Sequence, residues 1–163
     1  MADEVDAIVA AWRREAPALD VSPMQVLSRV SRLSRHLDLA RRDAFAAHDL
    51  EVWEFDVLAA LRREGEPYEL SPGELTRQTL STSGTMTNRI DRLEAKGLVS
   101  REPNTADRRG VRVRLTAEGM TRVSAALADL LGFERELLGR VEPETREQLA
   151  DALRRLLVSF EAD

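Results

Sequence analysis

The chain has 163 residues, a formal net charge of −5 at pH 7, no cysteine, and two histidines, His36 and His48. Without thiols there is no disulfide framework, and two histidines do not supply a transition-metal cage, so we expect no metal and no cofactor. The length fits one domain with a sizeable core. The sequence has no apolar run long enough to span a bilayer and no basic segment followed by an apolar one, as in a signal peptide, so we expect a cytoplasmic protein with no membrane partner.

Three helices are predicted in the first part of the chain. Residues 3–15 carry apolar side chains, among them Trp12, at helical spacing. The sequence Ser-Pro-Met-Gln that starts at Ser22 has the form of a capping box, so we expect a long helix to begin there and to end near His48. Residues 52–63 are apolar on most sides, which is typical of a central buried helix.

Residues 71–116 predict two short helices followed by a two-stranded β-hairpin. Ser71, Pro72 and Glu74 form a second capping box, which predicts a helix from Pro72. Another helix start falls within residues 81–83, and apolar positions then recur at helical spacing. The inner face of this second helix carries Met86, Ile90, Leu93 and Gly97.

The outer face of the second helix is small and polar, as a helix that enters the major groove of DNA requires. Short hydroxyls near a helix N-terminus suit phosphate, while longer amide and guanidinium side chains reach base edges. The residues that we expect to contact DNA from this helix are Ser83, Thr85, Thr87, Asn88 and Arg92.

The hairpin is predicted over residues 98–103 and 111–115, around a polar tip. Arg108 and Arg109 lie on that tip. A narrow minor groove has enhanced negative potential that attracts such an arginine, and Asp107 could hold it extended.

The charge of the chain is unevenly distributed. Residues 83–114 include eight basic and four acidic side chains, a net charge of +4, and the remainder of the chain carries −9. This asymmetry directs phosphate toward one face of the molecule and repels it from the rest.

The sequence TNRIDRLEAKGLVSREPNTADRRGVRVRLTAEG, residues 87–119, resembles the recognition helix and wing of the MarR family of transcriptional regulators. The resemblance places the base-reading helix of the family on residues 83–92 and its Asp-x-Arg wing pair on Asp107 and Arg109. It implies a sequence-specific DNA-binding regulator, and we expect repression, the commoner outcome in that family. Because the chain has no cysteine, the cysteine-based peroxide sensing that some members of the family use is excluded.

The resemblance also implies the architecture. We expect a mostly α fold with a small β-wing, a single MarR-like domain over residues 1–163, and a winged helix-turn-helix lobe over residues 52–116. Residues 3–48 and 117–160 are expected to form dimerisation helices.

The sequence predicts two helices after the wing. Thr116 begins a helix that Gly139 interrupts, and Pro143 restarts a leucine-rich one. We interpret their apolar faces as the interface of a homodimer that reads a pseudo-palindromic operator in double-stranded DNA. The alternative is that these faces cap the core of a monomer.

A weaker resemblance concerns a MarR subgroup that has an extra N-terminal helix and responds to urate or other small organic anions. The ligand-binding pattern of that subgroup falls on Trp12, Asp56, Arg89 and Arg101. The helical wheel puts Arg89 at the border of the core face, from which it could reach a cleft instead of DNA. A guanidinium suits a carboxylate or a urate-like anion, and an indole offers a stacking wall.

The hypothesis is that an anion held by Trp12 and Arg89 repels Asp56 and pulls the recognition helix. This changes the spacing between the half-sites of the dimer, so that DNA is released. Three alternatives stay open. Trp12 could anchor the dimer, Asp56 and Arg89 could form a structural ion pair, and Arg101 could contact phosphate.

Other classes of function find less support in the sequence. It has no nucleophile elbow, no phosphate-binding loop and no histidine near a carboxylate cluster, so we do not expect an enzyme. A winged-helix module that binds only proteins, without a ligand response, is the alternative function. A steep fall in DNA affinity with salt would separate the two, because phosphate contacts release counterions.

Overall fold

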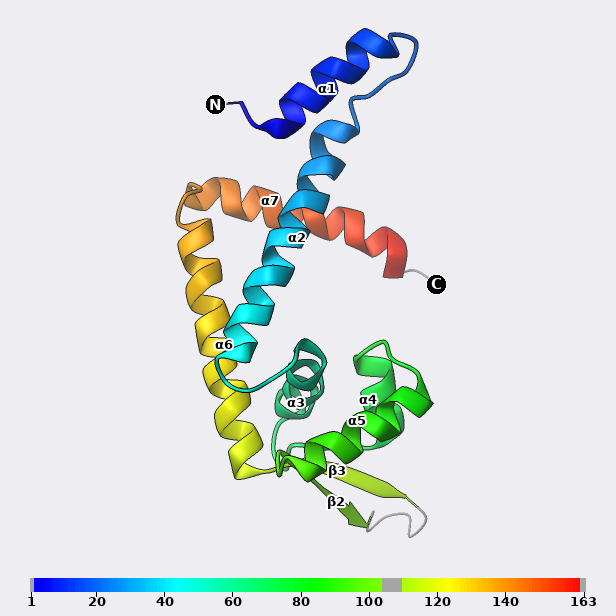
Figure 1. The fold of residues 1–163 in the computed structure, drawn as a ribbon, viewed down its shortest axis with the longest axis vertical. Coiled ribbons are helices and arrows are strands. Elements are labelled where there is room, and N and C mark those ends of the chain that lie inside the picture. The colour runs from blue at the N-terminus through cyan, green and yellow to red at the C-terminus, as the bar shows by residue number, and fades with distance from the viewer. Residues whose placement is uncertain (1, 104–109, 162–163) are drawn as a thin grey trace.

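The structure is a computed structural model that describes residues 2–103 and 110–161. These residues form a mostly helical chain with one small sheet, as the sequence predicts (Figure 1). The elements are α1 (Glu4–Glu15), α2 (Met24–Ala46), α3 (Val52–Glu64), β1 (Glu69–Leu70), α4 (Pro72–Gln78), α5 (Ser83–Ala95), β2 (Val99–Pro103), β3 (Val111–Leu115), α6 (Ala117–Leu138) and α7 (Pro143–Glu161). None of the helices in the described ranges combines the length and apolar character needed to cross a bilayer.

The long helix α2 connects two ends of the molecule (Figure 1). At one end it carries α1, and at the other it reaches the lobe formed by α3, α4, α5 and the sheet. The helix α6 packs against both α2 and α3. The rings of Phe45 on α2 and Phe55 on α3 stack with their centroids 3.9 Å apart, which joins the end of α2 to the lobe.

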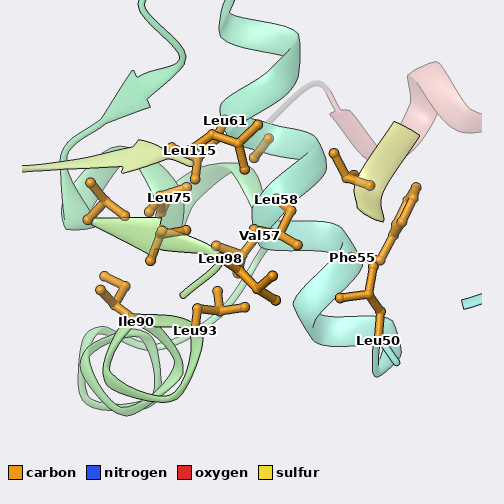
Figure 2. Packing of buried hydrophobic residues seen from close by; sticks show 14 of the residues in the cluster. Leu50, Phe55, Val57, Leu58, Leu61, Leu75, Ile90, Leu93, Leu98 and Leu115 are labelled. Atoms are coloured by element: carbon orange, nitrogen blue, oxygen red, sulfur yellow. The ribbon is translucent and has the colours of Figure 1, made fainter. Parts of the chain in front are cut away.

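The lobe is built around α3, as its apolar sequence predicts. Val57, Leu58 and Leu61 of this helix are fully buried. Figure 2 shows their side chains converging with those of Ile90 and Leu93 from α5. Each such side chain contributes roughly 1.5–3 kcal/mol through the burial of apolar surface, so this core fixes the position of α5 firmly.

Helix starts in the lobe follow the predicted caps. The Ser71 hydroxyl accepts the Glu74 backbone N–H at 3.3 Å, and the Glu74 carboxylate accepts the Ser71 N–H at 2.7 Å, so the capping box is confirmed. Thr82 caps α5 through the Thr85 N–H, and Thr116 caps α6 in the same way.

The capping box predicted at Ser22 is wrong. The helix α2 begins at Met24 with no side-chain cap. The Ser22 hydroxyl and backbone N–H both donate to the Asp20 carboxylate, at 3.0 and 2.9 Å. An aspartate readily accepts from the backbone two residues ahead of it, and this turn takes the Ser22 N–H that a capping box would give to Gln25. The Gln25 N–H donates to the Ser22 carbonyl oxygen and not to its hydroxyl.

The sheet has one strand more than predicted. The hairpin of β2 and β3 is confirmed, but β1 also pairs with β3, in the order β1-β3-β2. The register places Leu70 opposite Val113, and both side chains are buried. The additional strand ties the loop between α3 and α4 to the base of the wing.

The N-terminal helix α1 docks on α2 through a small core and a charge cluster. Val5 and Val9 are buried. Arg29 on α2 reaches Asp3 and Asp6, each at 2.7 Å. Its hydrogen bond is the main reason that the pKa of Asp3 lies below the usual 3.8. The pKa of Asp6 is lowered first by the Asp3 backbone N–H and then by Arg29.

These pKa shifts predict that docking of α1 depends on pH. Because both pKa values are lower in the folded chain than in the unfolded one, the cluster stabilises docking above about pH 4, and this contribution is lost as the pH falls through the folded values. Hydrogen exchange of residues 4–15, corrected for intrinsic rates, should show protection at pH 5 that decreases at pH 3. An Arg29→Ala chain should already have the lower protection at pH 5.

The matched control is Arg14→Ala, because Arg14 pairs only with the adjacent Glu15 among the described residues. It should behave like the wild type at both pH values. Equal protection of α1 in all three chains at pH 5 would show that the small apolar core alone holds the helix.

Candidate nucleic-acid interface

The recognition helix predicted from the sequence is α5, and its two faces differ sharply. Met86, Ile90 and Leu93 are buried, and they hold one face against the lobe. The opposite face is open to solvent. All five residues that we expect to contact DNA from this helix are exposed: Ser83, Thr85, Thr87, Asn88 and Arg92.

The hydroxyls at the start of α5 are held locally. The Thr82 and Thr85 side-chain oxygens lie 2.8 Å apart, and the Thr87 hydroxyl donates to the Ser83 carbonyl oxygen at 3.3 Å. These contacts order the first turn, where backbone N–H groups point away from the helix. Such an ordered N-terminus is suited to receive a phosphate.

Arg92 does not extend freely from the helix. Its Nη2 donates to Glu51 Oε1 at 2.6 Å, and its guanidinium lies 4.8 Å from the centre of the Trp53 ring. Trp53 Nε1 in turn donates to Glu51 Oε2 at 2.7 Å. We call these three residues the Glu51 clamp. The hydrogen bond from Trp53, followed by that from Arg92, lowers the pKa of Glu51, so its carboxylate is charged at neutral pH.

A second link fixes the other end of α5. Lys96 Nζ donates to Glu54 Oε2 at 3.0 Å and to the Asp49 carbonyl oxygen at 3.2 Å. Glu54 is fully buried, and the same carboxylate oxygen accepts the backbone N–H of Glu51 at 2.9 Å. A buried carboxylate requires such partners, so this pair holds the C-terminal end of α5 on α3.

Two hollows meet at Trp53. A cleft of about 600 Å³ lies between α2, α3 and α5, and a hollow of about 450 Å³ lies on the outer face of α5. Trp53 and Arg89 line both, with the Arg89 guanidinium 5.4 Å from the centre of the ring. The cleft is also lined by Arg42, Ala46, Leu50, Glu51, Val52 and Asp56, and the hollow by Gly84, Thr85, Asn88 and Arg92.

The four residues of the expected ligand pattern do not come together within one chain. Arg89 is half-buried at the border of the two faces of α5, and it lines the cleft together with Asp56. Asp56 pairs with Arg41 at 2.9 Å and not with Arg89, so the structural Asp56–Arg89 pair is wrong.

Trp12 and Arg101 lie elsewhere. Trp12 is on α1, at the opposite end of α2 from the cleft (Figure 1). A helix of 23 residues spans about 34 Å, which is too far for one side chain to cross. Arg101 on β2 pairs with Asp91 and Glu94 of α5. The indole that lines the cleft together with Arg89 and Asp56 is that of Trp53, at the start of α3.

The arginines on the strands are paired with carboxylates. Arg112 reaches Glu74 at 2.9 Å, and Arg114 reaches Glu69 at 2.9 Å. The basic surface is therefore smaller than the net charge of this region indicates. The expected wing-tip contacts, Asp107, Arg108 and Arg109, lie outside the described residues.

Comparison with known proteins agrees with this arrangement. A sequence model described as MarR family matches residues 48–110. The HTH-type transcriptional regulator PecS of Dickeya dadantii (strain 3937) is 39% identical over 153 residues, which cover 94% of this chain and 92% of that protein.

Solved structures share the fold. AbsC, a MarR family transcriptional regulator from Streptomyces coelicolor, has a TM-score of 0.75 at 21% identity, over 89% of this chain and 99% of that one. Wild-type MarR from E. coli, in its apo form, has a TM-score of 0.67 at 26% identity, over 80% of this chain and 96% of that one. The family model matches the lobe, and PecS aligns with nearly the whole chain. The protein therefore belongs to the MarR family of DNA-binding, winged-helix transcriptional regulators.

Proposed function

We propose that the chain is a repressor that binds a pseudo-palindromic operator as a homodimer and is released by a small organic anion. The observation that carries the proposal is the outer face of α5, which is small, polar and exposed while its inner face is fully buried. Membership of the MarR family does not favour the alternative of a module that binds only proteins.

For the operator, the division of roles follows the geometry of α5. Ser83 and Thr85 lie in its first turn, and we assign them to phosphate because hydroxyls and backbone N–H groups at a helix N-terminus suit an anion. Asn88, one turn further along the same face, is long enough to pair with the N6 and N7 groups of adenine. Arg92 is the candidate for guanine, once it leaves Glu51.

For the homodimer, the support is the apolar surface at the end of the molecule away from the lobe. No residue of α7 from Pro143 to Phe160 is buried, although the helix is rich in leucine. Most of the stability of a helix in a protein comes from the packing of its apolar face, and monomers rarely expose large contiguous apolar patches. A second copy would cover Val26, Leu27, Val30, Leu33, Leu131, Leu138, Leu149, Leu156 and Leu157.

For the anion, we place the site in the cleft between α2, α3 and α5. Arg42 and Arg89 supply two guanidinium groups, and Trp53 supplies an aromatic wall. An anion bound there would draw Arg89 away from the Trp53 ring and repel Asp56. Because Trp53 also contacts Arg92, such a change reaches the outer face of α5. Anion and DNA must then weaken each other by the same factor.

The experiment uses two DNA probes of equal length. The selected duplex is enriched by the wild-type chain from a randomised pool, and the unrelated duplex is a shuffled sequence. Urate, citrate and benzoate are titrated into the complex with the selected duplex, and we expect one of them to lower the affinity about tenfold or more, within the usual range of coupling between sites. An Arg89→Ala chain should bind the duplex and resist release.

The matched control is Arg63→Ala, which removes the same charge from the exposed end of α3, outside the cleft. It should be released like the wild type. Release of the Arg89→Ala chain at the wild-type concentration of the same anion would place the sensor elsewhere. If none of the three anions acts, the regulator stands and the anion site is withdrawn.

A further inference from the structure

The Arg92 guanidinium can pair with two kinds of anion: the phosphates of DNA and a carboxylate of the protein itself. In the free chain Arg92 is held by the Glu51 carboxylate on α3, from a position 41 residues away in the sequence. Both side chains are about half exposed, at 52% for Arg92 and 55% for Glu51. The pair therefore lies where DNA phosphates can reach it, and it is not locked in the core.

The indole of Trp53 helps the Glu51 carboxylate to compete with DNA phosphates for Arg92. Its N–H fixes Glu51 Oε2, which leaves Oε1 aimed at Arg92. Its ring lies under the guanidinium at a distance typical of a cation–π contact. Arg92 is thus held by an ion pair on its edge and by an aromatic surface on its face. Leaving this position for a single phosphate exchanges one anion for another.

The edge of a guanine base fits the Arg92 guanidinium better than a single phosphate does. Guanine accepts two hydrogen bonds from one guanidinium through O6 and N7, in the plane that an arginine fork fits. Unrelated DNA presents phosphates everywhere, but the correct base only by chance. A built-in carboxylate therefore suppresses the sequence-independent contact more than the sequence-dependent one.

We propose that Glu51 is a specificity-determining residue, which withholds Arg92 from phosphates and releases it to a matching base edge. The proposal rests on the proposed function, because it assumes that α5 enters the major groove. It assigns to the N-terminal end of α3 a role in reading DNA, although Glu51 itself contacts no base.

The test is Glu51→Gln, measured on the selected and the unrelated duplex across a range of salt concentrations. Glutamine keeps an oxygen for the Trp53 N–H but no longer offers Arg92 an anion. Affinity for the unrelated duplex should rise about tenfold in a dimer that carries the change twice. The salt dependence, d log K/d log[salt], should become steeper by about 0.9 for each additional phosphate that the protein neutralises. Affinity for the selected duplex should change less, so the specificity ratio falls.

Two further chains make the result specific. Glu118→Gln removes the same charge, but Glu118 pairs with Arg122 on α6, so its affinity for unrelated DNA should stay at the wild-type value. In Glu51→Gln/Arg92→Ala the increase in affinity should vanish, because the effect acts through Arg92. Helical content from circular dichroism verifies that each chain is folded.

The outcomes separate the inference from the proposed function. A wild-type chain that binds neither duplex would contradict both. A wild-type chain that prefers the selected duplex, with a Glu51→Gln chain that matches Glu118→Gln, would overturn only the role of Glu51. The role of Glu51 would also be overturned if the affinity for the unrelated duplex rose as much in Glu51→Gln/Arg92→Ala as in Glu51→Gln. The Glu51 carboxylate would then act by general repulsion of DNA and not through Arg92.

Discussion

Replacing Gly119 by alanine is expected to destabilise the lobe by about 3 kcal/mol, at the upper end of the usual cost of overpacking. A Cβ at this position would lie 2.1 Å from the Leu98 carbonyl oxygen and 2.8 Å from Leu115 Cδ1. The nearer contact is backbone, so it cannot be relieved by a change of rotamer. The helix α6 would have to move away from the chain that leads from α5 into the wing.

The matched control for this prediction is Gly132→Ala in the same helix. Nothing lies within 4 Å of a Cβ there, and alanine is favoured over glycine in a helix by about 1 kcal/mol. Denaturant unfolding should therefore give opposite signs for the two variants. A Gly119→Ala chain as stable as the wild type would show that α6 is not seated against Leu98 as described.

Replacing Asn88 by alanine is expected to abolish most of the preference for the selected duplex. Asn88 is exposed on the outer face of α5, so its loss should leave folding intact. A bidentate contact to adenine contributes about 1–3 kcal/mol of discrimination. A dimer loses it twice, so affinity for the selected duplex should fall roughly 10³-fold, since each 1.4 kcal/mol is a factor of ten.

Binding to unrelated DNA supplies the control for Asn88→Ala, because phosphate contacts remain. Its affinity for the unrelated duplex and its salt dependence should match those of the wild type. Equal losses on both duplexes would mean that Asn88 contacts the backbone of DNA. No loss on either would place base reading outside the middle of α5.

The sequence predicts local structure well where a side chain acts on its own neighbours. Ser71, Thr82 and Thr116 cap the helices that follow them, because each hydroxyl lies next to the N–H group that it accepts. Ser22 has the same pattern and fails. Asp20, two residues before it, accepts the Ser22 N–H that the capping box would need, and its other oxygen accepts the Ser22 hydroxyl.

Features that depend on distant parts of the chain were not predictable in this way. The strand β1 has two residues, too few for an alternating pattern, and it is defined only by its pairing with β3. The net charge of the wing region did not reveal that Arg112 and Arg114 are paired with glutamates on β1 and α4. Counting charges along a sequence gives their sum and not their partners.

The candidate site shows the same division. The helical wheel put Arg89 at the border of α5, and the structure finds it there, lining the cleft. The wheel also assigned Arg92 to the outer face but could not give the direction of its side chain, which depends on Glu51. Trp53 reads as a core residue in an apolar helix, although it forms the wall between the cleft and the outer face of α5.

The most direct test of a homodimer that reads DNA through α5 is a titration of the wild-type chain onto the selected duplex. Stoichiometry and salt dependence are measured together. We expect two chains per duplex, with log K falling linearly with log salt concentration by about 0.9 for each phosphate contacted. We also expect weaker binding to the unrelated duplex. One chain per duplex at saturation, or an affinity that salt does not change, would contradict this account.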